Sequence, residues 1–203
     1  KNGATIVVQE EHSVPIVAFR AAFAGGLRSE TAVNNGLTSL LARTITRGTT
    51  SIGAEQLSHV LDRLAGSISA MAGISSMTLR GEFLSKYFSN GSELFADVLL
   101  HPAFSESEFK REQMLQLQDI AARDDRPSSM VFELFAKTLY TKHPYRLSSL
   151  GENQSCSNVR TTGLRDYHER CLVPAHMTLA VVGDVETDEV FAYAEKYFSA
   201  QPK

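Results

Sequence analysis

The chain has 203 residues, a hydrophobic content of 43% and a formal net charge of −3. This length allows one well-filled core, and we expect a single domain spanning residues 1–203 that is a fragment of a longer chain. Lysine and arginine are scattered singly, which disfavours nucleic-acid binding, and no apolar run approaches the roughly 20 residues of a membrane helix. We therefore expect a soluble domain, either periplasmic or cytoplasmic.

The first third of the chain predicts two strands and then two helices. Residues 5–9 and 15–24 are rich in β-branched and small apolar residues and flank the polar segment EEHSV, which favours a hairpin. From Asn34 onward, leucines recur at helical spacing until RGTT stops the pattern. A second helix is predicted over 53–65, with Gly66 as its C-cap.

The rest of the chain predicts more helices than strands. The alternating stretch 67–83 favours two strands about Gly73, and 177–184 reads as an apolar strand. Ser105 and Glu108 form a capping-box pattern for a long helix that reaches about Arg123. Further helices are predicted at 84–100, 127–139, 162–172 and 186–198. This order indicates an α+β fold, a two-layer sandwich in which a mainly antiparallel β-sheet packs against several helices.

Common catalytic patterns are missing from the sequence. The six histidines form no i, i+4 pair, and we expect surface or capping roles for them: His12, His59, His101, His143, His168 and His176. Cys156 and Cys171 show no metal-ligand spacing. The chain also lacks a glycine-rich phosphate loop and a G-x-S-x-G motif.

One segment, NNGLTSLLARTITRGTT, resembles the metal-binding helix of the pitrilysin/insulinase family of zinc peptidases, whose pattern is N-G-L-x-H-x-x-E-H-x-x-x-x-G-T. The matching frame positions are Asn35, Gly36, Leu37, Gly48 and Thr49. Further segments resemble the family in the correct order, namely NGATIVVQEEHSVPIVAFRAAFAGGLRSE, LFADVLLHPAFSESEFKRE, HPYRLSSLGE and YHERCLVPAHMTLAVVGDVE. The resemblance extends over nearly the whole chain and implies a processing-peptidase-like fold.

The family's chemical residues are replaced in this sequence. The resemblance places the two histidine ligands at Ser39 and Arg43 and the general-base glutamate at Ala42. It places the third ligand, a glutamate seven residues beyond the acid at Glu112, at Asp119. An arginine keeps its proton and repels a dication, serine is a poor zinc ligand, and alanine cannot accept a proton from water. We therefore predict no catalytic residue and no metal site in this domain.

Two hypotheses follow from these replacements. The first is that Arg43 and Asp119 form an ion pair that bridges two helices; the alternative is that both side chains are separately solvated.

The second hypothesis concerns the segment GSISAMA, at 66–72, which matches the family's substrate-pairing strand G-x-x-N-A-x-T. The backbone there could pair with an extended peptide, with Ser67, Ser69, Ala70 and Ala72 as candidate positions. The alternative is an ordinary core strand.

The resemblance implies a non-catalytic domain of a zinc metalloendopeptidase that helps to form a peptide-holding chamber. Its partners would be homologous domains of its own chain or a separate catalytic subunit, together with a peptide substrate, and zinc is expected in the catalytic half. The alternative is a purely structural subunit related to respiratory-complex core proteins. An intact H-x-x-E-H in the parent chain or a neighbouring subunit would separate these hypotheses.

Overall fold

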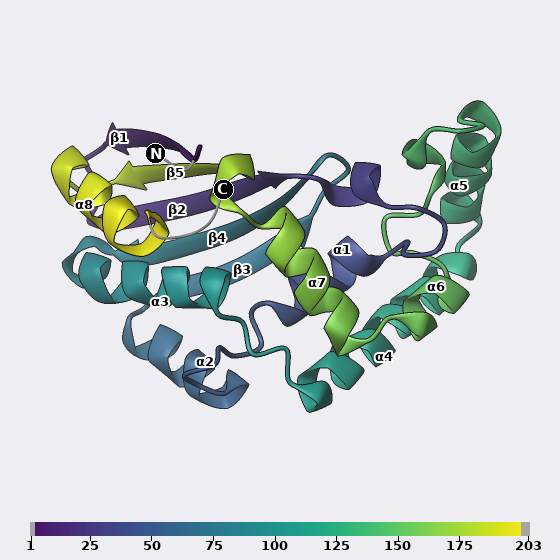
Figure 1. Cartoon of the computed structure of the whole chain (residues 1–203), viewed down its shortest axis with the longest axis horizontal. Coiled ribbons are helices and arrows are strands. Elements are labelled where there is room, and N and C mark those ends of the chain that lie inside the picture. The colour runs from purple at the N-terminus through teal and green to yellow at the C-terminus, as the bar shows by residue number, and fades with distance from the viewer. Residues whose placement is uncertain (1–2, 200–203) are drawn as a thin grey trace.

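A computed structural model describes residues 3–199 of the chain (Figure 1). Its five-stranded sheet has the order β1-β5-β2-β4-β3. The strands are β1 (Thr5–Glu10), β2 (Ile16–Ala24), β3 (Ser67–Ala72), β4 (Ser76–Leu84) and β5 (Met177–Gly183). Only β1 and β5 pair in parallel among these neighbours, which confirms the predicted α+β fold with a mainly antiparallel sheet.

Eight α-helices accompany this sheet within the described residues. They are α1 (Leu37–Thr44), α2 (Ala54–Arg63), α3 (Phe88–Leu100), α4 (Glu106–Asp124), α5 (Pro127–Leu139), α6 (Asn153–Asn158), α7 (Thr161–Cys171) and α8 (Thr187–Phe198). The sequence pattern missed α6, because its six residues are mostly polar and carry no apolar period. No helix in the part of the chain described here combines the length and apolar character needed to cross a bilayer.

The predicted hairpin of the first two strands is wrong, because β5 lies between β1 and β2. The connection EEHSVP instead passes over the end of β5, where Glu11 N donates to Gly183 O and Asp184 N donates to Ile16 O. Crossing one intervening strand spans about 10 Å. This segment also lacks the Asn-Gly or Asp-Gly pair that closes a tight hairpin.

The C-terminus of α2 differs from the predicted glycine cap. Ala65, with a φ of 44°, adopts the left-handed conformation, while Gly66 N donates to Leu61 O and Ala65 N to Asp62 O in a Schellman pattern. Gly66 serves a packing purpose instead. A Cβ at this position would lie 2.3 Å from a ring carbon of Phe83.

The core lies between one face of the sheet and the helices. Inward residues of the central strands, such as Phe19, Leu79 and Val181, pack with Phe95 of α3 and Phe198 of α8. The opposite face of the sheet is open among the described residues and exposes large apolar side chains, including Val7, Ile16, Met71 and Val182. The molecule is therefore a two-layer sandwich with one uncovered sheet face.

Helix α5 projects from the body of the molecule (Figure 1). Five apolar side chains that recur at helical spacing are 45–67% exposed: Met130, Val131, Leu134, Phe135 and Leu139. We call this set the outer face of α5. Such a contiguous apolar surface is unusual for a domain that functions alone.

We predict opposite stability effects for alanine at two glycines. Gly66→Ala should lower the free energy of unfolding by about 1–3 kcal/mol, because the buried Phe83 ring has no room to shift. Gly163→Ala in α7 should raise it by about 0.5–1 kcal/mol, since no atom lies within 4 Å of the added Cβ. Urea unfolding followed by circular dichroism measures both. A neutral Gly66→Ala variant would contradict the packing argument.

Candidate functional site

The start of α1 is fixed by a buried carboxylate. Glu30 accepts hydrogen bonds from the backbone N–H groups of Gly36 at 2.7 Å and Thr38 at 2.8 Å, and from Asn35 Nδ2 at 2.9 Å. These bonds satisfy donors that a helix N-terminus leaves free, and the positive end of the helix dipole favours the negative charge. The helix that carries the family motif positions therefore begins at a defined point.

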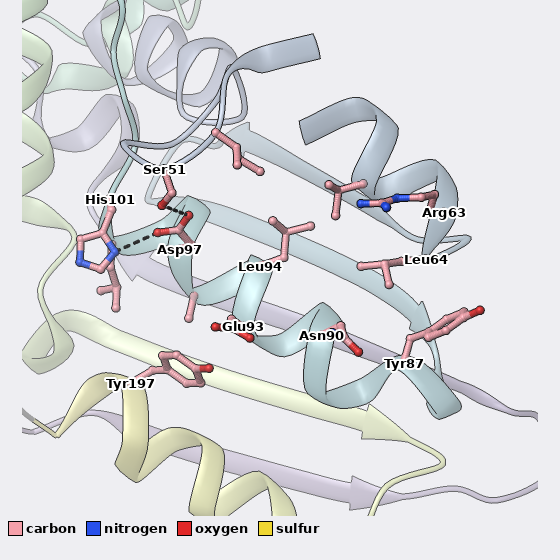
Figure 2. Close-up of a pocket in the computed structure, with 14 residues that line it drawn as sticks. Ser51, Arg63, Leu64, Tyr87, Asn90, Glu93, Leu94, Asp97, His101 and Tyr197 are labelled. Atoms are coloured by element: carbon pink, nitrogen blue, oxygen red, sulfur yellow. Dashed lines mark hydrogen bonds and ion pairs between the residues drawn. The ribbon is translucent and has the colours of Figure 1, made fainter. Parts of the chain in front are cut away.

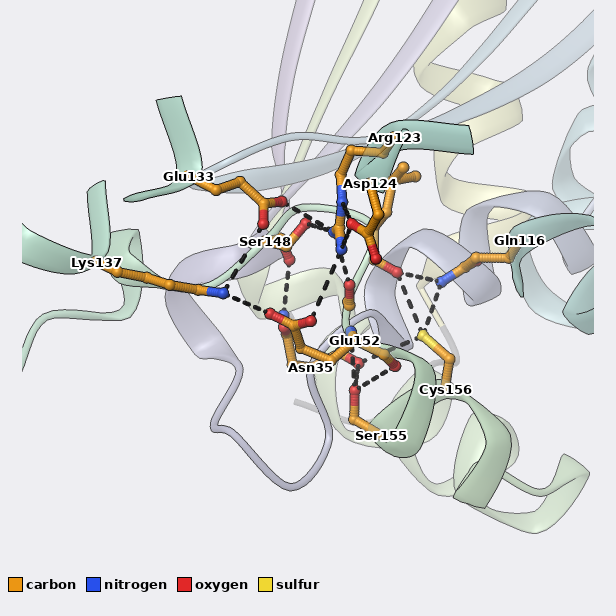
Figure 3. Close-up of polar contacts among 12 residues, drawn as sticks. Asn35, Gln116, Arg123, Asp124, Glu133, Lys137, Ser148, Glu152, Ser155 and Cys156 are labelled. Carbon is orange, nitrogen blue, oxygen red and sulfur yellow. Dashed lines mark hydrogen bonds and ion pairs between the residues drawn. The ribbon is translucent and has the colours of Figure 1, made fainter. Parts of the chain in front are cut away.

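A polar network ties this start to α4 and α6 (Figure 3). Gln116 Nε2 on α4 donates to Gly36 O at 3.0 Å and to Leu150 O at 2.8 Å. On the α6 side, Ser155 Oγ donates to Asn35 O at 2.8 Å. Gly36 has a φ of 90°, and a Cβ there would lie 2.6 Å from Leu150 O, so only glycine fits. In the sequence, the pair Asn35-Gly36 marks this start of α1.

The buried thiol of Cys156 and the half-buried imidazole of His168 have structural roles. Burial raises the pKa of the Cys156 thiol, which stays protonated and lies 3.3 Å from Leu150 O. Burial likewise lowers the pKa of His168, so its neutral Nε2–H donates to Leu99 O at 2.7 Å. Neither group is arranged as a nucleophile or a general base.

Helix α1 carries Ser39, Ala42 and Arg43, and Arg43 reaches α4. Ala42 is buried, Ser39 is half-buried, and Ser39 forms no side-chain hydrogen bond within residues 3–199. Arg43 Nη2 lies 2.5 Å from Asp119 Oδ2 of α4. Their side chains are 27% and 53% exposed, so this contact between the helices lies near the surface.

A second contact joins the segment after α1 to a buried carboxylate on α4. Arg47 Nε, just beyond the end of α1, is 2.8 Å from Glu112 Oε1, and the Glu112 side chain is only 3% exposed. The sequence identified Glu112 only as the acid that precedes the ligand position, and Arg47 was missed. The available signal was its spacing, because Arg47 stands four residues after Arg43 as Arg43 stands four after Ser39.

These residues do not fit a zinc ion. The guanidinium of Arg43 is a cation at a position predicted for a metal ligand, and the carboxylate of Asp119 already contacts it. Within the described part of the chain, no three His, Cys, Asp or Glu residues cluster closely enough to hold a metal.

The candidate peptide-pairing strand β3 lies at the edge of the sheet and pairs only with β4 among the described strands. Ser67 and Ser69 are exposed, whereas Ala70 and Ala72 are half-buried. Helix α1 packs against this strand. The free edge and the motif helix are therefore neighbours.

A cavity of about 650 Å³ between α2, α3 and α8 contains another group of polar residues (Figure 2). Ser51 Oγ donates to Asp97 Oδ2 at 3.0 Å, and His101 Nδ1 lies 3.2 Å from Asp97 Oδ1. The carboxylate thus stands between serine and histidine. A nucleophilic triad needs the imidazole in the middle, so this group does not activate the serine.

Comparisons with known proteins identify family models and relatives that are similar to this chain. A family model described as insulinase (peptidase family M16) matches residues 5–153, and one described as the peptidase M16 inactive domain matches residues 159–203. An uncharacterized zinc protease of Bacillus subtilis is 25% identical over 200 residues, which make up 98% of this chain and 49% of the relative. Zinc protease PqqE of Helicobacter pylori is 24% identical over 210 residues, with 98% of this chain and 46% of the relative covered.

Solved structures have the same fold. A protease from Helicobacter pylori superposes with a TM-score of 0.91 at 22% identity, over 100% of this chain and 49% of that one. A peptidase M16 inactive domain from Pseudomonas fluorescens has a TM-score of 0.93 at 22% identity, over 99% and 49%. The chain spans about half the length of the curated relatives that it matches.

We predict that the two contacts between α1 and α4 differ in energy. Arg47→Met should lower the free energy of unfolding by about 3 kcal/mol, because Glu112 would be left buried without its partner. Asp119→Ala should cost about 0–1 kcal/mol, as expected for an exposed pair.

The double variant Arg47→Met/Glu112→Leu serves as the control and should recover most of the loss, since no unpaired charge remains. Urea unfolding of the three variants measures this. Equal costs for Arg47→Met and Asp119→Ala would contradict the assignment of the deeper pair.

Proposed function

The chain belongs to the insulinase family of M16 peptidases, and we propose that it is a non-catalytic domain that helps to form the peptide-holding chamber of a zinc metallopeptidase. The observation that carries this proposal is the contact between Arg43 and Asp119, which joins a cation to the remaining carboxylate at the family's ligand positions. Ala42, in the place of the general base, is buried and has no proton acceptor. The match to the M16 inactive-domain model supports the same conclusion.

Hydrolysis in such a protein has to come from another domain. A zinc peptidase needs three metal ligands, a metal-bound water and a general base. Of the four corresponding positions in this chain, only Asp119 supplies a metal-binding side chain. We propose that an intact H-x-x-E-H lies in a homologous domain, either in the same polypeptide or in a separate subunit. The relatives, about twice as long as the matched segment, leave room for such a domain.

The free edge of β3 supports peptide holding. Gly73 N donates to Ser76 O at 2.7 Å, which makes this pair a hydrogen-bonded one at the hairpin turn. Because hydrogen-bonded pairs alternate along an antiparallel ladder, Ser67 and Ser69 direct their backbone groups toward β4. Ala70 and Ala72 then direct theirs outward, where an extended peptide can add as a further strand.

The outer face of α5 supports a protein partner. Residues 3–199 leave its five apolar side chains exposed. They also leave large apolar side chains on the open face of the sheet exposed. Apolar surfaces of this kind typically mark protein–protein contacts. We propose that a homologous domain of the same protein or complex occupies them.

The degenerate site can be tested by restoring it. We expect the purified chain to contain no stoichiometric zinc and to cleave no peptide. The quadruple variant Ser39→His/Ala42→Glu/Arg43→His/Asp119→Glu should bind zinc stoichiometrically, because it supplies three donors on the same frame. Mass-spectrometric metal analysis after dialysis measures both proteins.

The matched control keeps Arg43 and carries the other three substitutions. It should not bind zinc, since the cation remains at a ligand position. Stoichiometric zinc or peptide cleavage in the unmodified chain would overturn the non-catalytic assignment.

Peptide holding can be tested with a backbone probe. A fluorescent extended peptide should bind the chain, and N-methylation of one residue whose N–H faces β3 should weaken binding about 2- to 13-fold, because one lost hydrogen bond contributes about 0.5–1.5 kcal/mol. Ala70→Pro should weaken binding similarly, since proline at an edge position removes only an outward N–H. Fluorescence anisotropy measures these affinities.

Ser69→Ala is the control, because it leaves the outward backbone groups of β3 intact. If the peptide fails to bind at all, the structural-subunit alternative replaces peptide holding as the function of this domain.

A further inference from the structure

A cleft of about 670 Å³ adjoins the contact between Arg43 and Asp119, and we call it the α4–α5 cleft. Its walls are α4, the inner side of α5, the loop 145–150 and the turn between β3 and β4. Ile74, in that turn, is the second residue after the end of the candidate peptide-pairing strand. An extended peptide that continues past the end of β3 would therefore reach the cleft.

Both carboxylates of the cleft are already compensated by cations. Asp119 contacts Arg43, as described above. Glu133 lies 2.9 Å from Arg123 Nη1 and 3.8 Å from Lys137 Nζ (Figure 3). Arg123 is itself held by Ser148 and Asp124. Glu152 also contacts Arg123 and Lys137, so these three cations and four carboxylates together carry one net negative charge.

Two further arginines line the cleft without such compensation. Arg126 and Arg146 are exposed, and neither forms an ion pair with a carboxylate in the described part of the chain. Arg146 Nη1 donates to Thr141 O at 2.7 Å, which leaves most of its donors free, while the guanidinium of Arg126 has no hydrogen-bond partner among residues 3–199. The cleft therefore carries a net positive charge.

Apolar side chains stand beside these cations. Ile74 and Phe132 are exposed and line the cleft together with Leu27, Leu147 and Leu150. A ligand that fits must present an apolar surface and a carboxylate close together. Arginine recognises a carboxylate through paired N–H donors, which gives direction as well as charge complementarity.

We propose that the α4–α5 cleft binds an acidic residue flanked by bulky apolar residues in the peptide that lies along β3. This inference rests on the proposed peptide-holding function and adds a sequence preference to it. Backbone pairing along β3 accepts almost any sequence, so the two arginines would supply the selectivity that the strand lacks.

The test compares two fluorescent peptides that differ only in one glutamate or glutamine between leucines. At low ionic strength the glutamate peptide should bind the chain about 3- to 10-fold more tightly, because two exposed ion pairs each contribute modestly. The preference should shrink at high salt, since exposed pairs are screened. The double variant Arg126→Gln/Arg146→Gln should abolish it while the glutamine peptide binds as before.

Arg160→Gln is a matched control. Arg160 precedes α7 as Arg126 precedes α5, it is exposed, and it lies outside the cleft. This variant should keep the preference, and circular dichroism should show that all variants are folded.

The possible failures are distinguishable. Equal binding of the two peptides, or a preference that survives in the double variant, would overturn the acidic-peptide inference and leave peptide holding intact. Binding of neither peptide would overturn both.

Discussion

The buried carboxylate of Glu30 is the constraint on which the site depends. It accepts hydrogen bonds from the N–H groups of Gly36 and Thr38 and from the side chain of Asn35, so it fixes where the helix begins and how it is turned about its axis. Arg43 and Arg47 follow at one-turn spacing, and they meet Asp119 and Glu112, which are two turns apart on α4. The order of the partners is reversed along the chain, as required for two antiparallel elements.

The fold keeps the family frame, and no group of three His, Cys, Asp or Glu side chains in residues 3–199 could hold a metal. In a zinc site, the ion itself would join the two helices. Here, the buried Glu112 contacts Arg47 and the amide of Gln116 donates to Gly36 O, whereas the contact of Asp119 with Arg43 lies near the surface. Structures at 22% identity still superpose with TM-scores above 0.9.

Local sequence patterns predicted most helices and strands, whereas pairings between distant segments were harder to predict. Apolar spacing identified α1 because burial on one face imposes a period on the sequence, whereas β5 was identified as an apolar run. The pairing of β1 with β5 was missed, since about 170 residues separate the two strands. Nothing in the segment EEHSV indicates that it does not close a hairpin between β1 and β2. The polar helix α6 has no period to detect.

The site shows the same division. The family frame located Arg43 and Asp119, but the compensated and uncompensated cations of the α4–α5 cleft depend on distances between segments, which no local pattern encodes.

The apolar outer face of α5 has a further thermodynamic consequence. Any protein that covers it binds the folded chain and not the unfolded one, so folding and assembly become linked equilibria. At a partner concentration 100 times the Kd, this linkage adds about 2.7 kcal/mol to the free energy of unfolding. The melting temperature of the chain would then rise with the concentration of its partner, and stabilities measured on the chain alone would be lower bounds for the assembled protein.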